Sequence, residues 1–178
     1  SSTRGGAEPF PLSAVALAPG PFAHAQELAL RSALQLDPDR LLAPFRREAG
    51  LPTGPGYGGW ESDGLDGHTL GHVLSALAAH AAGGSAAARE RMEVIVGGLR
   101  ECQLALGTGY LGGVPDGVSL WQEIADGRVE AQTFDLGGRW APLYNLHKTL
   151  TGLIDAVVYA GSASARVVTA DYVAWWVR

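Results

Sequence analysis

The spacing of glycine breaks between apolar segments most constrains how this chain of 178 residues can fold. Tight turns at Gly83-Gly84 and at Gly161 alternate with long Gly-rich connections over residues 50–67 and 107–140. Between these breaks, apolar residues recur every three or four positions, which is typical of helices, and strand-like alternation is scarce. The pattern predicts an all-α fold of stacked helical hairpins whose long connections gather on one face.

Local signals give the expected limits of the helices. Asp37, followed by Pro38, and Ser85 are the expected N-caps, and Gly107 is an expected helix end. Residues 1–20 are expected to be irregular, and the connection over 107–140 is long enough to suggest a functional loop. Helices are expected over about residues 22–36, 38–45, 68–82, 86–106 and 141–160, with a further one that starts near Ala163.

The last predicted helix, SARVVTADYVAWWVR, is still gathering apolar residues where the sequence stops. A chain of this kind is expected to be the first part of a larger toroid of hairpins. Its inner apolar helix faces would then be exposed, and self-association through them is expected.

Composition and charge exclude several classes of partner. A net charge of -5 with 13 basic residues and no basic run argues against binding to nucleic acid or to an anionic membrane surface. No apolar run reaches the roughly 18 to 20 residues that span a bilayer. The start, SSTRGGAEPFPLS, is not an intact signal peptide. One cysteine excludes a disulfide framework and a multi-cysteine metal site within this chain, and it leaves the compartment open.

The densest polar stretch is GGWESDGLDGHTLGH at residues 58–72. His68 and His72 lie four residues apart, on nearly the same side of one predicted helix, where they could bind a ligand together. A structural bond from one imidazole to a loop carbonyl is the alternative. A zinc pair is disfavoured because His68 is followed by Thr69 rather than by the glutamate of a metalloprotease helix.

The loop before these histidines supplies an aromatic ring and several acids. Trp60 could stack on a sugar ring or simply pack within the loop. Asp66 is either the N-cap of the following helix or a ligand of substrate. The candidate carboxylates for acid and base chemistry in glycoside hydrolysis are Glu61, Asp63, Glu123 and Asp135.

Two further residues stand on predicted apolar helix faces. His147 falls between Leu146 and Leu150 on the helix over 141–160, where a polar ring needs a partner or must line a wet cavity. Cys102 lies on the apolar face of the helix over 86–106, which indicates a small buried side chain rather than a nucleophile.

Three long motifs carry a family resemblance: YGGWESDGLDGHTLGHVLSALA, ECQLALGTGYLGGVP and WAPLYNLHKTLTGLIDA. Over about residues 20–178 they resemble the N-terminal part of the catalytic domain of the bacterial β-L-arabinofuranosidase family, glycoside hydrolase family 127 and its relatives, formerly domain of unknown function 1680. The resemblance implies an (α/α)6 barrel, with residues 21–178 as its N-terminal portion. It also implies retaining hydrolysis of terminal L-arabinofuranosyl residues of plant-derived glycans.

The resemblance also implies which residues act. The family uses a zinc-held cysteine nucleophile with further cysteines and a glutamate, plus a glutamate acid/base. None of these matches this chain, so no catalytic residue and no cofactor is assigned to it, and zinc belongs to the complete site of the family. The motifs carry over a wall of the sugar pocket. Its expected residues are His68, His72 and His147 for hydrogen bonds to hydroxyls, Trp60 for stacking, and Asp66 and Glu61 as second choices.

Two other classes of function remain open for such a sequence. A non-catalytic carbohydrate-binding or truncated scaffold module would keep the same pocket wall without turnover. Another (α/α)6 glycosidase or a polysaccharide lyase would use carboxylates, or a histidine and a tyrosine, from these loops. In each case the expected partner is an oligosaccharide or glycan.

Overall fold

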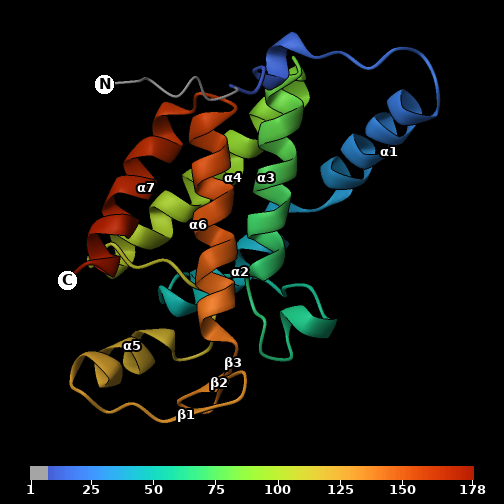
Figure 1. Ribbon diagram of the computed structural model, residues 1–178. Coiled ribbons are helices and arrows are strands. Elements are labelled where there is room, and N and C mark those ends of the chain that lie inside the picture. Colours follow the sequence, from blue (N-terminus) through green and yellow to red (C-terminus); the bar gives the residue numbers. More distant parts are fainter. Residues whose placement is uncertain (1–7) are drawn as a thin grey trace, which may run out of the picture.

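The computed structural model describes residues 8–178, and these residues are mostly helical (Figure 1). They form two short 3-10 helices, η1 (Leu12–Ala14) and η2 (Gly59–Glu61). The α-helices are α1 (Pro21–Gln35), α2 (Pro38–Glu48), α3 (His68–Ala82), α4 (Ala86–Leu106), α5 (Gly117–Ala125), α6 (Pro142–Val158) and α7 (Ala163–Trp176). The predicted all-α class is confirmed.

The long helices form two consecutive hairpins, α3 with α4 and α6 with α7. In Figure 1, α3 and α6 lie side by side, α4 crosses behind them and α7 lies beside α6. Gly71 and Gly152 make the contact between α3 and α6 possible, because a Cβ atom on Gly71 would collide with the backbone carbonyl of Lys148. Repeated hairpins in this arrangement are consistent with part of an (α/α)6 barrel.

Local chemistry fixes several helix ends where the sequence predicts them, although α2 continues to Glu48, beyond the expected end at residue 45. The Asp37 carboxylate accepts a hydrogen bond from the Asp39 N–H at 2.9 Å at the start of α2. The Ser85 hydroxyl accepts one from the Ala88 N–H at 3.2 Å at the start of α4. Gly107 ends α4 with a φ of 67°, a conformation that glycine adopts without strain.

The core lies between the hairpins and α2. Leu42, Leu74 and Leu99 are buried there, and so is Cys102, as predicted. One detail of α6 differs from expectation, since the apolar residues of this helix do not share a single buried face. Leu146, Leu153 and Ala156 are buried, whereas Leu143 and Ile154 are 52% and 42% exposed. The reason is that α6 meets α3 through small residues such as Gly152, which turns the opposite side of the helix to solvent.

The prediction of one loop over residues 107–140 is wrong in detail. This segment contains α5 and a three-stranded antiparallel sheet, β1 (Ala131–Gln132), β2 (Asp135–Leu136) and β3 (Arg139–Trp140). Gln132 pairs with Asp135, and Leu136 pairs with Arg139. Strands of two residues are too short to show a periodic pattern, so only the folded chain reveals them. In Figure 1 they lie below the start of α6.

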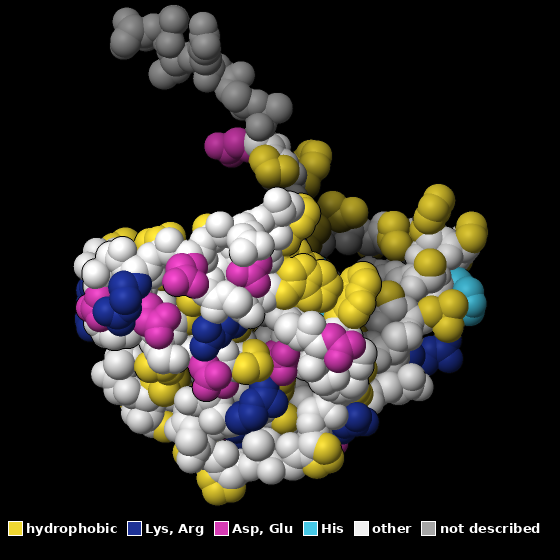
Figure 2. Space-filling view, turned by 90° about the horizontal axis from the view of Figure 1, so that it is seen from below, with side chains coloured by type: hydrophobic (Ala, Val, Ile, Leu, Met, Phe, Trp, Pro, Cys, Tyr) yellow, Lys and Arg dark blue, Asp and Glu magenta, His cyan; other side chains and the backbone are white. Residues whose placement is uncertain are grey.

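The N-terminal part of the described chain stands apart from the hairpins. Only Ala33 of α1 is buried, whereas Phe22 is 76% exposed. In Figure 2 apolar side chains continue from the upper edge of the body onto the arm at the right, while charged side chains are scattered over the rest of this face. Over residues 8–178, no helix combines the length and apolarity needed to cross a membrane. Self-association through exposed apolar faces stays a prediction.

Candidate functional site

The start of α3 is built on a buried acid from the preceding loop. Glu61, at the end of η2, is 8% exposed, and its carboxylate accepts hydrogen bonds from the backbone N–H groups of Gly67 at 2.8 Å and Thr69 at 2.7 Å. These N–H groups have no partner within the helix, and they favour a negative charge. Gly67 occupies the N-cap position with a φ of 91° and offers no side chain. The alternative that Asp66 is the N-cap is therefore wrong, because Glu61 satisfies these donors.

The same acid orients the first residue of the helix. His68 Nδ1 lies 2.6 Å from the carbonyl oxygen of Leu65 and 2.7 Å from Glu61 Oε1. Both neighbours can only accept, so Nδ1 carries the hydrogen. In the neutral ring Nε2 is then the unprotonated nitrogen, an acceptor of fixed position. No described residue hydrogen-bonds to Nε2.

Two rings lie beside that of His68, and a lysine lies over one of them. The His72 ring centroid is 6.0 Å from that of His68, and the Tyr144 ring from α6 is 6.1 Å from His68. His72 Nε2 lies 3.3 Å from the Tyr144 hydroxyl, and the Lys148 ammonium lies 4.9 Å from the Tyr144 ring centroid. We call His68, His72, Tyr144 and Lys148 the imidazole cluster. It joins α3 to α6, with His72 and Tyr144 exposed and His68 and Lys148 half-buried.

The charge state of His72 follows from these neighbours. Partial burial lowers its pKa, and the positive charge of Lys148, together with that of His68 when its ring is protonated, lowers it further, against the opposite effect of Glu61. His72 therefore favours the neutral form more than a free histidine does. A neutral imidazole offers one donor and one acceptor, which suits a hydroxyl group.

His147 lies apart from the other two histidines. It is exposed on α6, one turn after Tyr144, and its Nε2 atom lies 3.4 Å from the Thr151 hydroxyl. The expected position between buried leucines is wrong, because the buried side of α6 is the one that carries Leu146. The structure places His147 on the same solvent-facing side of α6 as Tyr144, with no contact to His68 or His72.

Asp66 connects the loop to α2. It is 4% exposed, with Oδ1 2.8 Å from Arg47 Nη2 and with Oδ2 accepting from the Gly64 N–H at 3.3 Å. Arg47 also donates to the carbonyl oxygen of Gly113, so the GYLGG segment is fastened beneath the start of α3. Both Asp66 and Glu61 thus already accept hydrogen bonds on each carboxylate oxygen.

Trp60 is 66% exposed and faces a second tryptophan. Its ring centroid is 6.3 Å from that of Trp140, at the end of β3, and the two planes make an angle of 84°. Gly64 allows this arrangement, because a Cβ atom there would lie 3.2 Å from Trp140 Cβ. The buried Asn145 donates from Nδ2 to the Gly64 carbonyl oxygen at 3.4 Å, which joins α6 to the loop.

Sequence reasoning missed three residues of this region: Trp140, Tyr144 and Lys148. All three belong to the motif WAPLYNLHK, from which only His147 was selected. Tyr144 and Lys148 are four residues apart, so helical spacing could have identified them as one face.

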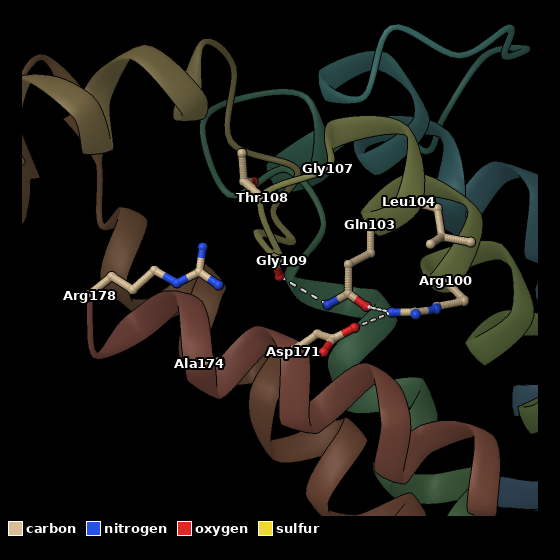
Figure 3. A pocket seen from close by; sticks show the side chains of 9 residues that line it. All are labelled: Arg100, Gln103, Leu104, Gly107, Thr108, Gly109, Asp171, Ala174 and Arg178. Atoms are coloured by element: carbon tan, nitrogen blue, oxygen red, sulfur yellow. Dashed lines mark hydrogen bonds and ion pairs between the residues drawn. The ribbon is translucent and has the colours of Figure 1, made fainter.

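A second polar cluster surrounds a pocket of about 240 Å³ between the ends of α4 and α7 (Figure 3). The buried Gln103 donates from Nε2 to the carbonyl oxygens of Gly109 at 2.9 Å and Val168 at 3.1 Å, and its Oε1 atom accepts from Arg100 at 2.6 Å. Arg100 also pairs with Asp171. Gln103 uses both ends of its amide within the protein, so this cluster fastens α4 to α7.

The described residues do not fit a zinc centre. No three His, Cys, Asp or Glu residues among them lie close enough together to hold a metal ion. Cys102 is fully buried, and burial raises the pKa of its thiol to about 11. A zinc ligand must be an ionised thiolate that the metal can reach, and Cys102 meets neither condition.

The chain is similar to one family of known proteins. A family model described as β-L-arabinofuranosidase, GH127 catalytic domain, matches residues 14–178. The match includes every helix from α1 to α7 and all residues of the imidazole cluster. No curated protein matches the chain.

Proposed function

The chain belongs to the GH127 β-L-arabinofuranosidase catalytic-domain family of glycoside hydrolases, and on that premise we propose that it forms one wall of a pocket for terminal L-arabinofuranosyl residues of plant-derived glycans. The wall is the joint exposed face of α3 and α6. The expected reaction class, retaining hydrolysis, follows from the family alone.

One observation supports the proposal most: the Leu65 carbonyl oxygen and the buried Glu61 carboxylate both lie against His68 Nδ1, which leaves Nε2 turned away from them. A furanose presents several hydroxyl groups, each of which donates one hydrogen bond and accepts others. His68 Nε2, His72 and the Tyr144 hydroxyl offer donors and acceptors at neighbouring positions, 6.0 Å and 6.1 Å apart from ring to ring. Polar groups of fixed orientation are what gives a sugar site its specificity.

Each expected site residue has a place in this proposal. His68 and His72 bind ring hydroxyls, and His147 binds a group of the substrate farther along α6. Trp60 stacks on a sugar ring. Glu61 and Asp66 act beneath them by holding the loop and the first turn of α3. Bond cleavage is assigned to none of the described residues.

Calorimetric titration of the protein with methyl β-L-arabinofuranoside tests the proposal. His68→Ala removes hydrogen bonds of about 0.5–1.5 kcal/mol each and is expected to weaken binding about tenfold. His147→Ala is expected to weaken binding less, because His147 lies apart from His68 and His72 and its one hydrogen-bond partner is Thr151 on its own helix.

His24→Ala is the matched control, since His24 is exposed on α1 away from the imidazole cluster. It is expected to leave the affinity unchanged, and all variants are first compared with the unaltered protein by thermal unfolding. Unchanged affinity in both His68→Ala and His147→Ala would contradict the proposed pocket wall.

A further inference from the structure

Two exposed tryptophans near the imidazole cluster are in contact with each other. Trp60 is 66% exposed and Trp140 is 42% exposed, and their perpendicular rings make a corner. Single exposed apolar residues are common, but two indoles in mutual contact expose a large apolar surface that solvent does not favour. The pair therefore suggests a ligand.

The backbone around both rings is specialised. Gly59 and Gly64, on either side of Trp60, have φ values of 64° and 109°. Ala141, directly after Trp140, has a φ of 44°, which costs free energy for a residue with a side chain. Its N–H donates to the carbonyl oxygen of Phe134 at 2.6 Å, so the hairpin holds the strained residue in place. A backbone conformation of this kind persists only where neighbouring contacts, here the bond to Phe134, hold the residue in it.

The tryptophan corner borders the imidazole cluster along both chains that carry it. Trp60 directly precedes Glu61, which contacts His68. Trp140 ends β3, four residues before Tyr144 on α6, and Tyr144 contacts His72. A ligand longer than one sugar ring can therefore meet both the polar cluster and the indole rings.

We propose that Trp60 and Trp140 together bind the sugar residue on the leaving-group side of the scissile bond. This inference rests on the proposed function and assigns Trp60 to the second sugar rather than to the terminal one. A sugar ring has an apolar face of C–H groups that packs on an indole face, and the perpendicular second ring limits how that sugar can turn. The terminal residue is held mainly by hydrogen bonds, and the next residue mainly by stacking.

The experiment compares two ligands in calorimetric titrations of the protein. One is methyl β-L-arabinofuranoside, and the other is a disaccharide of two β-linked L-arabinofuranosyl residues. Trp140→Ala is expected to weaken disaccharide binding about tenfold and to change methyl glycoside binding less than twofold, because an aromatic contact is worth about a tenfold change in affinity. Trp140→Phe, which keeps a flat ring, is expected to restore most of the loss.

Phe134→Ala is the matched control, because Phe134 is 75% exposed on the same hairpin but is not in contact with Trp60. It is expected to bind both ligands as the unaltered protein does. Equal losses for both ligands in Trp140→Ala, or no loss for the disaccharide, would overturn the assignment while leaving the pocket wall intact. Binding of neither ligand by the unaltered protein would instead overturn the proposed function, and this inference with it.

Discussion

The cluster around Glu61 and the cluster around Gln103 both centre on a buried polar side chain, but they differ in what that side chain holds. In each, a buried polar side chain, 8% and 3% exposed, bonds to backbone groups of neighbouring segments. Gln103 lies beside a hollow, yet all its bonds are internal, to Arg100 on α4, to the Gly109 loop and to Val168 on α7. Glu61 also fixes a backbone, but it holds His68 with one nitrogen unused, beside His72 and Lys148.

Under the proposed function, the hollow beside Gln103 is not the binding site. A buried group whose partners are all internal contributes to stability. A buried group that orients a side chain with unused hydrogen-bonding capacity prepares a binding surface. Variants at the two positions should therefore separate stability from ligand binding.

The largest effect is expected at the fastening cluster. Gln103→Ala removes the side-chain donor from the part-buried carbonyl oxygen of Gly109 and from the buried one of Val168, which should lower the free energy of unfolding by about 2–4 kcal/mol. Urea unfolding measures this loss. Binding of methyl β-L-arabinofuranoside should not change.

Asp171→Asn is the control within the same cluster. It removes an exposed partner of Arg100, and exposed ion pairs contribute at most about 1 kcal/mol. If Gln103→Ala reduced ligand affinity and left the unfolding free energy unchanged, the roles given to the two clusters would have to be exchanged.

A smaller effect on stability, with an effect on binding, is expected at the other cluster. Glu61→Gln keeps the shape of the side chain, but its NH2 group cannot accept from the N–H of Gly67 or Thr69. Loss of this capping interaction should cost about 1–2 kcal/mol. Because His68 Nδ1 also loses its carboxylate partner, affinity for the methyl glycoside should fall several-fold, by an amount on the order of one hydrogen bond.

Nitrogen NMR shifts of the His68 ring give the readout that a purely structural role of Glu61 would not move. They should report a hydrogen on Nδ1 in the unaltered protein, and the Nδ1 signal should shift in Glu61→Gln, because the charged neighbour is lost and the Leu65 carbonyl oxygen remains as acceptor. Glu90→Gln, on the exposed side of α4, should change neither stability nor the ring signals. An unchanged Nδ1 signal in Glu61→Gln would refute the orienting role.

The smallest expected effect is on the titration of His72. Its pKa lies below the ordinary value of 6.5, so the folded state favours the neutral ring. The resulting contribution to stability is fully present above the pKa of the unfolded chain and is lost as the pH falls through the folded pKa. Lys148→Met removes a nearby positive charge and should raise the pKa of His72, which makes this acid-induced loss smaller.

Proton NMR titration of the His72 ring measures the change. Arg166→Met removes a positive charge from the exposed side of α7 and should leave the titration of His72 unaltered. If Lys148→Met lowered the pKa or left it unchanged, Lys148 would not face the ring in solution as the structure places it.

Much of the fold could be predicted because its signals are local. Ser85 and Gly107 mark the two ends of α4, and each acts on backbone within a few residues of itself. The short α5 and the two-residue strands could not be predicted, since neither is long enough to show a period. His147 was misplaced because the apolar residues of α6 occupy more than one side, and only packing against α3 decides which side is buried.

The candidate site was predictable in part for the same reason. His68 and His72 lie on one helical face by spacing alone, and the structure places their rings side by side. Trp140 and Tyr144 were missed because they approach Trp60 and His72 only after the chain folds back on itself.

The sequence by itself determined where the long helices begin and end, because caps and glycine turns act within a few residues of backbone. It also determined the family, through motifs that are contiguous in the chain. Only the tertiary structure decided that Glu61 rather than Asp66 satisfies the start of α3, and that Trp60 meets Trp140. These contacts depend on how the loop before α3 folds against α6, and residue order alone does not specify that distance.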